Sequence, residues 1–126
     1  MVRGIGTDIV DIKRIERLID RYASHFLEKV FTPNEIGFCS AKAHPAVHFA
    51  GRWAAKEAFY KALPLPSQRL STWKSIEIVP QDSSGRPQIR ILSRELVDSL
   101  YAEKITSFLL SISHERSTCT AMVVLE

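Results

Sequence analysis

The sequence has very little cysteine and no long run of apolar residues. Its two cysteines, Cys39 and Cys119, form no CxxC pair, and no cluster of His and Cys has zinc-ligand spacing. These absences exclude a disulfide framework and a zinc site, and they predict two reduced thiols in a cytoplasmic protein. No segment reaches the roughly 18 apolar residues of a membrane span, and no apolar segment follows Arg3 as in a signal peptide. We therefore expect no membrane partner.

Glycine and proline are scarce as well, with 5 and 6 residues among 126. Together with 45% hydrophobic and 25% charged residues, this excludes a disordered or collagen-like chain. The length predicts one domain over residues 1–126, with enough apolar side chains for a core. The formal net charge of +3 is too small to select a partner, so the position of the charges matters more than their sum.

Apolar periodicity predicts an α+β domain with a mostly antiparallel sheet and a long central helix. The expected helices cover residues 11–22, 33–40, 45–63 and 93–103, and Thr32 and Glu35 form a capping box before the second. The expected strands cover residues 2–10, 73–80, 89–91, 106–113 and 118–125, with a loop over 64–72. Residues 118–125 are apolar at nearly every position, which predicts a strand buried on both faces.

Small residues mark one side of the long helix. Alanine recurs every four residues in a ridge that lets another element pack closely, at Ala50, Ala54, Ala58 and Ala62. The first strand contains glycines, which permit either a close backbone approach or a bulge.

Three charged residues form the first candidate site. Asp8 ends an apolar strand, where functional side chains often gather, but it could equally cap the next helix. Glu57 and Lys61 are one helical turn apart and could form an ordinary surface ion pair. Because alanines and Phe59 surround Glu57, a partly covered carboxylate that binds Lys61 or a metal is the alternative. Two carboxylates, completed by phosphates and waters, suit Mg²⁺.

Further cations could bind a phosphorylated ligand. The long helix carries Arg52, Lys56 and Lys61 between aromatic residues, which suits a phosphorylated nucleotide or, equally, a solvated face over the core. His114 closes a strand and could contact phosphate, transfer a proton or simply be exposed.

A second basic surface lies on the expected helix over residues 11–22. This basic face consists of Arg14, Arg17 and Arg21, at spacings of three and four. It is either solvated or binds an acidic partner, which would be a protein helix or a nucleic acid. Nucleic acid is the weaker choice, because the net charge is small and no aromatic ladder or recognition motif accompanies the arginines.

Four motifs coincide with one known family. The chain resembles the holo-acyl-carrier-protein synthases, bacterial 4′-phosphopantetheinyl transferases, over its whole length. The matching segments are GIGTDIV at residues 4–10, GRWAAKEAFYKAL at 51–63, GRP at 85–87, and SISH at 111–114 followed by Ala121. The helix signature is the most specific of these.

The resemblance implies a reaction and a set of site residues. Such enzymes transfer 4′-phosphopantetheine from coenzyme A to a serine of apo acyl carrier protein in fatty-acid synthesis and release adenosine 3′,5′-bisphosphate. The resemblance implies that Asp8 and Glu57 hold Mg²⁺ and that Lys61 binds the pyrophosphate. Glu57 is the candidate base, with His114 as the alternative. The residues expected near the rest of the coenzyme are Arg52, His114, Gly85, Arg86 and Pro87. The charge pattern of the long helix adds Lys56.

The resemblance also implies partners. Family members are homotrimers with active sites between protomers, and an acidic helix of the carrier protein docks on the basic face, where Leu18 adds an apolar contact. The family's glycine-rich turn after the helix signature is absent, because residues 62–68 read ALPLPSQ. Proline removes N–H groups that could face phosphate, so this loop is expected to contact coenzyme and carrier differently. The competing hypothesis is a non-catalytic basic module that binds an acidic protein helix or nucleic acid.

Overall fold

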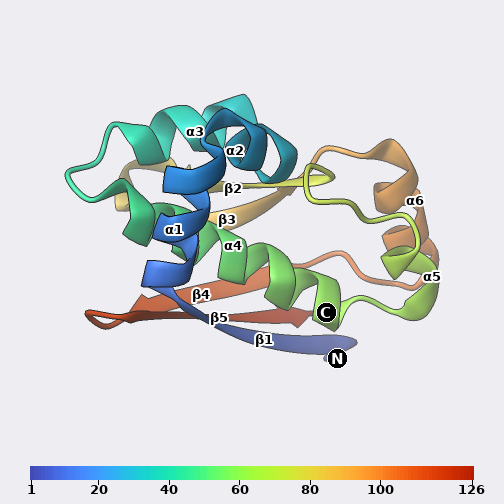
Figure 1. Ribbon diagram of the computed structural model, residues 1–126. Helices are drawn as coiled ribbons and strands as arrows, with labels where there is room; N and C mark the ends of the chain where they lie inside the picture. The colour runs from blue at the N-terminus through green and yellow to red at the C-terminus, as the bar shows by residue number, and fades with distance from the viewer.

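A three-stranded antiparallel sheet carries the longest helix of the protein on one of its faces (Figure 1). The computed structural model describes residues 1–126. Strand β5 (Thr118–Leu125) lies between β1 (Gly4–Asp11) and β4 (Phe108–His114), and Asp8 is opposite Ala121 in the register. Helix α4 (Pro45–Ala62) packs on β1 and β5, whose inward side chains, such as Val10 and Val123, are buried.

The small-residue ridge explains how closely α4 approaches β1. A Cβ atom at Gly6 would collide with the carbonyl oxygen of Ala58, and one at Gly4 would collide with that of Ala62. The alanines of the ridge are all buried, as expected. The two glycines thus serve close approach rather than a bulge, and this contact fixes β1 beside the last two turns of α4.

Three helices and a second hairpin complete the core. Helices α1 (Ile12–Tyr22), α2 (Ser24–Val30) and α3 (Pro33–Ser40) follow β1 and lie on the side of α4 away from the sheet (Figure 1). The hairpin of β2 (Ile76–Gln81) and β3 (Arg86–Ile91) turns through the short helix η1 (Asp82–Ser84). Helix α6 (Arg94–Ala102) begins at Ser93, whose hydroxyl accepts a hydrogen bond from the Leu96 amide.

The α+β class and the antiparallel pairing are confirmed, with local corrections. Helix α2 was not expected, and residues 64–72 contain α5 (Leu65–Gln68) rather than only loop. Pro64 and Pro66 lie in the N-cap and first turn of α5, where missing N–H groups are tolerated. Residues 73–75 form a turn instead of a strand start, because the Ser75 hydroxyl accepts from the Thr72 amide at 2.8 Å. No helix has the length and apolar character needed to cross a membrane.

The expectation that residues 118–125 are buried on both faces is wrong for a single protomer. Alternate residues of β5 face α4 and are buried, whereas Met122 is 46% exposed on the opposite face. Ile5 and Leu109 lie opposite Val124 on the neighbouring strands and share that face. Ile9 is 72% exposed there as well. This outer sheet face, defined by Ile5, Ile9, Leu109 and Met122, is therefore an uncovered apolar surface.

Candidate active site

Asp8 and Lys61 form an ion pair between β1 and the last turn of α4. The Lys61 Nζ lies 3.0 Å from Asp8 Oδ1 and donates a second hydrogen bond of 3.1 Å to the Thr7 carbonyl oxygen. The Asp8 side chain is only 13% exposed. Asp8 does not cap α1, because Asp11 accepts the N-cap hydrogen bond from the Lys13 amide. The pair is therefore tertiary, and Lys61 does not form the expected surface pair with Glu57.

Glu57 lies near this pair but has no hydrogen bond or ion pair of its own. Burial raises the pKa of the Glu57 carboxyl, and the Asp8 carboxylate raises that pKa further. Lys61 and Arg14 act in the opposite direction. Two carboxylates thus share the positive charge of one close lysine, and a ligand that brings positive charge would stabilise the ionised form of Glu57.

A pocket opens directly beside Glu57. Its volume is about 420 Å³, and the loop that precedes β2 forms its wall opposite α4. Half of the lining residues are hydrophobic, and the polar ones lie on α4 and at the start of the loop. The lining residues are Lys56, Glu57, Phe59, Tyr60, Ser71, Thr72, Trp73 and Ile76. The site can therefore hold a group with apolar and polar parts in contact with the Glu57 side chain.

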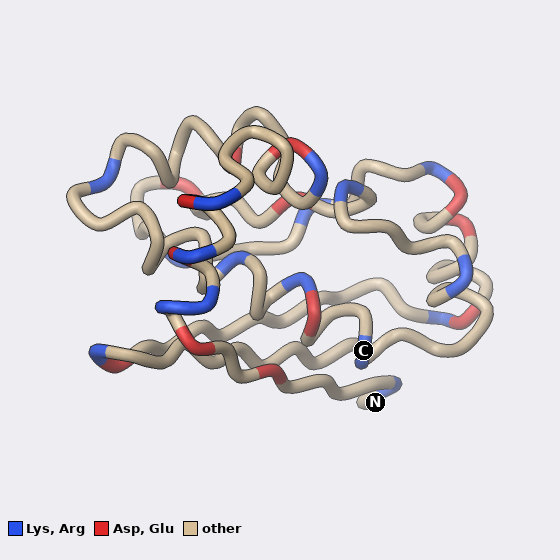
Figure 2. The backbone as a smooth tube through the Cα atoms, in the orientation of Figure 1, with Lys and Arg blue, Asp and Glu red and all other residues tan.

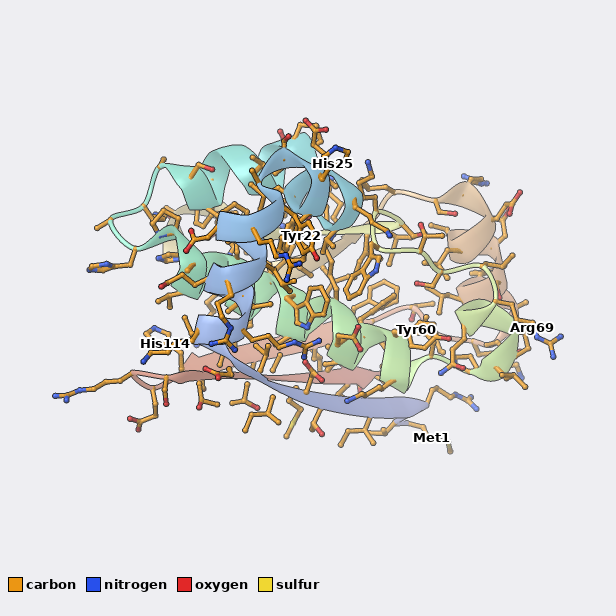
Figure 3. The ribbon with its side chains drawn as sticks, in the orientation of Figure 1. Met1, Tyr22, His25, Tyr60, Arg69 and His114 are labelled. Atoms are coloured by element: carbon orange, nitrogen blue, oxygen red, sulfur yellow. The ribbon has the colours of Figure 1, made fainter.

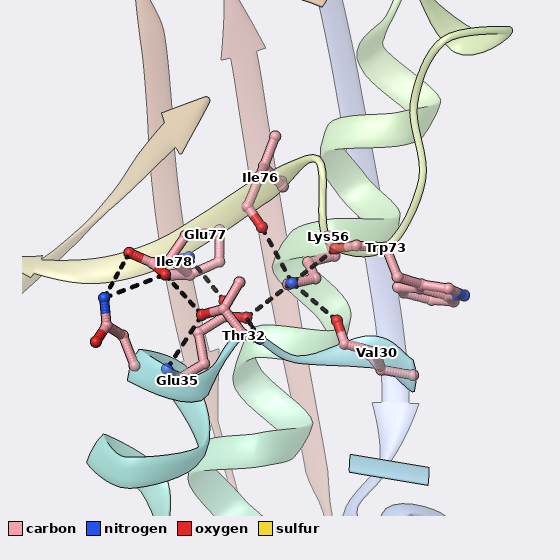
Figure 4. Close-up of polar contacts among 9 residues, drawn as sticks. Val30, Thr32, Glu35, Lys56, Trp73, Ile76, Glu77 and Ile78 are labelled. Atoms are coloured by element: carbon pink, nitrogen blue, oxygen red, sulfur yellow. Dashed lines mark hydrogen bonds and ion pairs between the residues drawn. The ribbon is translucent and has the colours of Figure 1, made fainter. Parts of the chain in front are cut away.

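Lys56 lines the inner side of the pocket, but its ammonium is held by groups in the interior of the protein. Its Nζ lies 2.8 Å from Glu35 Oε1 and donates to the carbonyl oxygens of Val30, Trp73 and Ile76 at 2.9, 2.7 and 3.1 Å (Figure 4). Since an ammonium has three protons, these four acceptors use its whole donor capacity. We expected Lys56 to contact coenzyme phosphates, but its ammonium instead binds groups inside the protein.

The other expected nucleotide contacts lie on the opposite side of α4. Arg52 and Lys61 are nine positions apart, which places them about 180° apart around the helix. Arg52 is 7% exposed, its guanidinium lies 4.3 Å from the centre of the Phe38 ring, and its Nε has no hydrogen-bond partner. His114 is exposed at the end of β4, the edge strand, far from Tyr60 of the pocket (Figure 3).

The turn expected near the nucleotide belongs to the second sheet. Gly85 adopts the left-handed conformation, with φ of 72°, and is followed by Arg86 and Pro87 at the start of β3. Strand β3 packs beside β4, which ends at His114. The structure thus assembles Asp8, Glu57 and Lys61 on one side of α4, and it does not bring Arg52, His114 or this turn to them within one protomer.

The sequence analysis did not predict that Lys42, His48 and Arg52 lie around the Phe38 ring. Lys42 Nζ lies 4.4 Å from the centre of the Phe38 ring, and the His48 ring lies 6.3 Å from it. Burial lowers the pKa of His48, and Arg52, Lys42 and His114 lower that pKa further by their charges. The spacing of four between His48 and Arg52 was the available signal, because it places both on one face of α4.

The basic face of α1 is exposed and reaches toward the pocket. Its arginines surround the half-buried Leu18 in a shallow hollow, and Figure 2 shows basic positions along α1. The Arg14 guanidinium lies 5.8 Å from the centre of the Trp53 ring, and Trp53 packs on Trp73 with centroids 4.5 Å apart. A partner on α1 would therefore lie close to the residues that line the pocket.

The comparisons with known proteins agree with the motifs. A model of the 4′-phosphopantetheinyl transferase superfamily matches residues 4–121. The chain belongs to this superfamily. It is 42% identical over 126 residues to the holo-[acyl-carrier-protein] synthase of Syntrophus aciditrophicus, covering 100% of this chain and 97% of the relative. The expected family membership is confirmed.

Solved structures of superfamily members share the fold. The crystal structure of the Neisseria meningitidis holo-[acyl-carrier-protein] synthase matches with a TM-score of 0.85 and 34% identity, covering 100% of this chain and 99% of that one. The Helicobacter pylori enzyme, solved in complex with coenzyme A, matches with a TM-score of 0.79 and 32% identity over 97% and 99% of the two chains. Both likenesses extend over nearly the whole domain, so this transferase has the same architecture as these two enzymes.

Proposed function

We propose that this transferase is a holo-acyl-carrier-protein synthase. It moves 4′-phosphopantetheine from coenzyme A to a serine of apo acyl carrier protein in fatty-acid synthesis, in the cytoplasm. The observation that carries the proposal is the meeting of Asp8, Glu57 and Lys61 beside a pocket of about 420 Å³. Mass spectrometry of an apo carrier protein incubated with the enzyme and coenzyme A tests it. A gain of one phosphopantetheine group is expected.

The reaction asks mainly for positioning and for control of charge. The carrier serine oxygen forms a bond to the phosphorus that bears the pantetheine arm. The bond from that phosphorus to the bridging oxygen breaks, and adenosine 3′,5′-bisphosphate leaves with the electron pair. Lys61 binds the pyrophosphate and offsets the charge that develops on the leaving group. The pocket holds the pantetheine arm, since half of its lining residues are hydrophobic and Glu57 is one of the polar ones.

Glu57 is the residue that accepts the serine proton. Its carboxylate lies at the pocket, within reach of a hydroxyl bound there, and in the protein without Mg²⁺ burial and the Asp8 carboxylate raise the pKa of Glu57. His114 is the alternative base, but within one protomer it lies at the far end of the sheet from the pocket (Figure 3). Within one protomer this placement favours Glu57, whereas in a site shared between protomers His114 would come from the neighbouring chain.

Asp8 and Glu57 are the residues that would hold Mg²⁺. Carboxylate oxygens are the ligands that this hard cation prefers. The Asp8 carboxylate raises the pKa of Glu57, so a cation bound by both carboxylates would stabilise the ionised form of Glu57. The two side chains therefore fit the ion. When bound, Mg²⁺ supplies charge neutralisation for the pyrophosphate.

The separation of the candidate residues supports a site shared between copies of the chain. Arg52 lies about 180° around α4 from Lys61, and His114 and residues 85–87 lie at β4 and β3 rather than at β1, which carries Asp8. The nucleotide and pyrophosphate contacts would therefore come from different protomers. The outer sheet face offers the surface for assembly, because exposed apolar patches of this kind mark interfaces. A homotrimer is the assembly that family resemblance implies.

Charges introduced into the outer sheet face should dissociate the assembly. The double variant Ile9→Glu/Leu109→Glu places two carboxylates on that face, where an interface would bury them without partners. Light scattering coupled to size exclusion is expected to change from trimer to monomer, with loss of transfer. Leu92→Glu is the matched control, because Leu92 is also exposed but lies between β3 and α6. A wild-type monomer at assay concentration would contradict the shared site.

The basic face of α1 should control the affinity for the carrier protein. Arg21→Ala is expected to raise the KM for the carrier by about tenfold, because it removes an exposed charge that attracts an acidic helix, while kcat changes little. The effect should shrink as salt screens the charges. Steady-state kinetics at two ionic strengths measures both quantities. Equal KM values for the variant and the wild type at low salt would rule out docking on α1.

The non-catalytic binding module is not favoured. A module that only binds a partner does not account for the ion pair of Asp8 with Lys61 or for the pocket beside it. A nucleic acid partner is not expected either, since the basic face carries no recognition motif.

A further inference from the structure

The buried Lys56 ammonium connects three separate segments to α4. Its acceptors are the Glu35 carboxylate of α3, the Val30 carbonyl at the end of α2, and two carbonyls at the start of β2 and in the turn before it. Figure 4 shows these contacts converging on one Nζ atom. Lys56 and Glu35 side chains are 2% and 0% exposed. The lysine therefore acts from within the core.

Glu35 is itself held by backbone groups, so the position of Lys56 is well defined. Glu35 Oε1 accepts from the Thr32 amide at 2.9 Å and Oε2 accepts from the Ile78 amide at 2.8 Å. The Thr32 hydroxyl donates to Glu77 Oε2 in the same cluster (Figure 4). Glu35 therefore both completes the capping box of α3 and orients Lys56.

The carbonyls that Lys56 holds belong to residues that form the pocket. Trp73 and Ile76 both line it, and the next residue of α4 after Lys56 is Glu57. The Trp73 indole also packs on Trp53. Loss of the ammonium would release the wall of the pocket while leaving the Asp8–Lys61 pair, on the other side of Glu57, in place.

We propose that Lys56, oriented by Glu35, is a positioning residue that sets the width of the pocket by holding the Trp73–Ile76 segment against α4. This inference rests on the proposed function, in which the pocket takes the pantetheine arm. Lys56 contacts no substrate in this account. It acts through the pocket wall.

The test is the double variant Lys56→Met/Glu35→Gln. It removes both buried charges together, which avoids leaving either one unpaired in the core. We expect the KM for coenzyme A to rise by about tenfold and kcat to change by less than about threefold. The near-ultraviolet circular dichroism of the Trp53–Trp73 pair should weaken. Arg94→Met, which breaks the exposed pair with Asp98, is the control and should change neither signal.

A purely structural role would give a different pattern. Lower melting temperature and lower kcat with an unchanged KM would overturn the proposal, and so would an unchanged KM with an unchanged dichroism signal. If the double variant does not fold, Ser75→Ala decides, because it loosens the same segment by removing the acceptor of the Thr72 amide. A raised KM in Ser75→Ala supports the proposal, and an unchanged KM refutes it.

Failure of the proposed function would be seen separately. A wild-type enzyme that transfers nothing to any carrier contradicts the transferase assignment. In that case calorimetric affinity for coenzyme A and the dichroism of the tryptophan pair, neither of which needs turnover, replace KM as the readouts for Lys56. Unchanged values of both in the double variant would then overturn the positioning role.

Discussion

Replacing Glu57 with glutamine is expected to reduce phosphopantetheine transfer by about a thousandfold, because it removes both the base and one of two carboxylates proposed to hold Mg²⁺. The thermal stability of this variant, unlike its transfer rate, should not fall. The pKa of Glu57 is raised in the folded protein, so the folded state binds that proton more tightly than the unfolded chain does. The ionised carboxylate therefore lowers stability as the pH rises from the ordinary pKa through the raised one. At neutral pH the glutamine variant should melt no lower than the wild type.

Two measurements check this prediction. Initial rates at saturating coenzyme A and carrier give the loss of kcat, and thermal melts with and without Mg²⁺ give the stability. Mg²⁺ should raise the melting temperature of the wild type but not that of Glu57→Gln. Glu28→Gln, at an exposed position of α2, is the matched control and should behave as the wild type. A glutamine variant with more than about a tenth of the wild-type rate would remove Glu57 from the role of base.

Replacing Lys61 with alanine is expected to lower kcat by about a hundredfold, because the lysine would otherwise stabilise charge that develops in the transition state. The variant also leaves the Asp8 carboxylate without its ion pair, although Asp8 keeps access to solvent at the sheet edge. The KM for the carrier protein should change little, since Lys61 is not among the residues that line the hollow on α1.

The contrast with Arg21→Ala makes the Lys61 prediction specific. One variant should lower kcat and the other should raise the carrier KM. Steady-state kinetics with the carrier varied at saturating coenzyme A separates the two effects. Equal losses of kcat in Lys61→Ala, Arg14→Ala and Arg21→Ala at saturating carrier would show that the division between chemistry and docking is mistaken.

The elements that follow regular periodicity could be predicted from the sequence. The apolar residues of β5 and the helical spacing in α1 give the type and approximate bounds of these elements, and Ser93 and Thr32 mark helix starts through their hydroxyl caps. Helix α2 could not be predicted in this way. It begins after Ala23, which has a positive φ and provides no side-chain cap.

The site was harder to predict, because its pairings are tertiary. The spacing of Glu57 and Lys61 favoured a local ion pair, whereas the approach of β1 to the alanine ridge brings Asp8 to Lys61 instead. The internal role of Lys56 was also hidden, since three of its four partners are backbone carbonyls, which any residue could supply. Sequence shows which charges exist, but packing decides which of them remain free for a ligand.

The measurement that tests the central claim most directly is the intact mass of an apo acyl carrier protein after incubation with the enzyme, coenzyme A and Mg²⁺ at low salt. Carriers from fatty-acid synthesis and from other pathways should both be included, and a carrier whose acceptor serine is replaced by alanine is the control. The account predicts a mass gain of one phosphopantetheine group on the intact carrier, no gain on the alanine carrier, and no gain with Glu57→Gln over the same interval. No gain with any carrier, or an undiminished gain with Glu57→Gln, would contradict it.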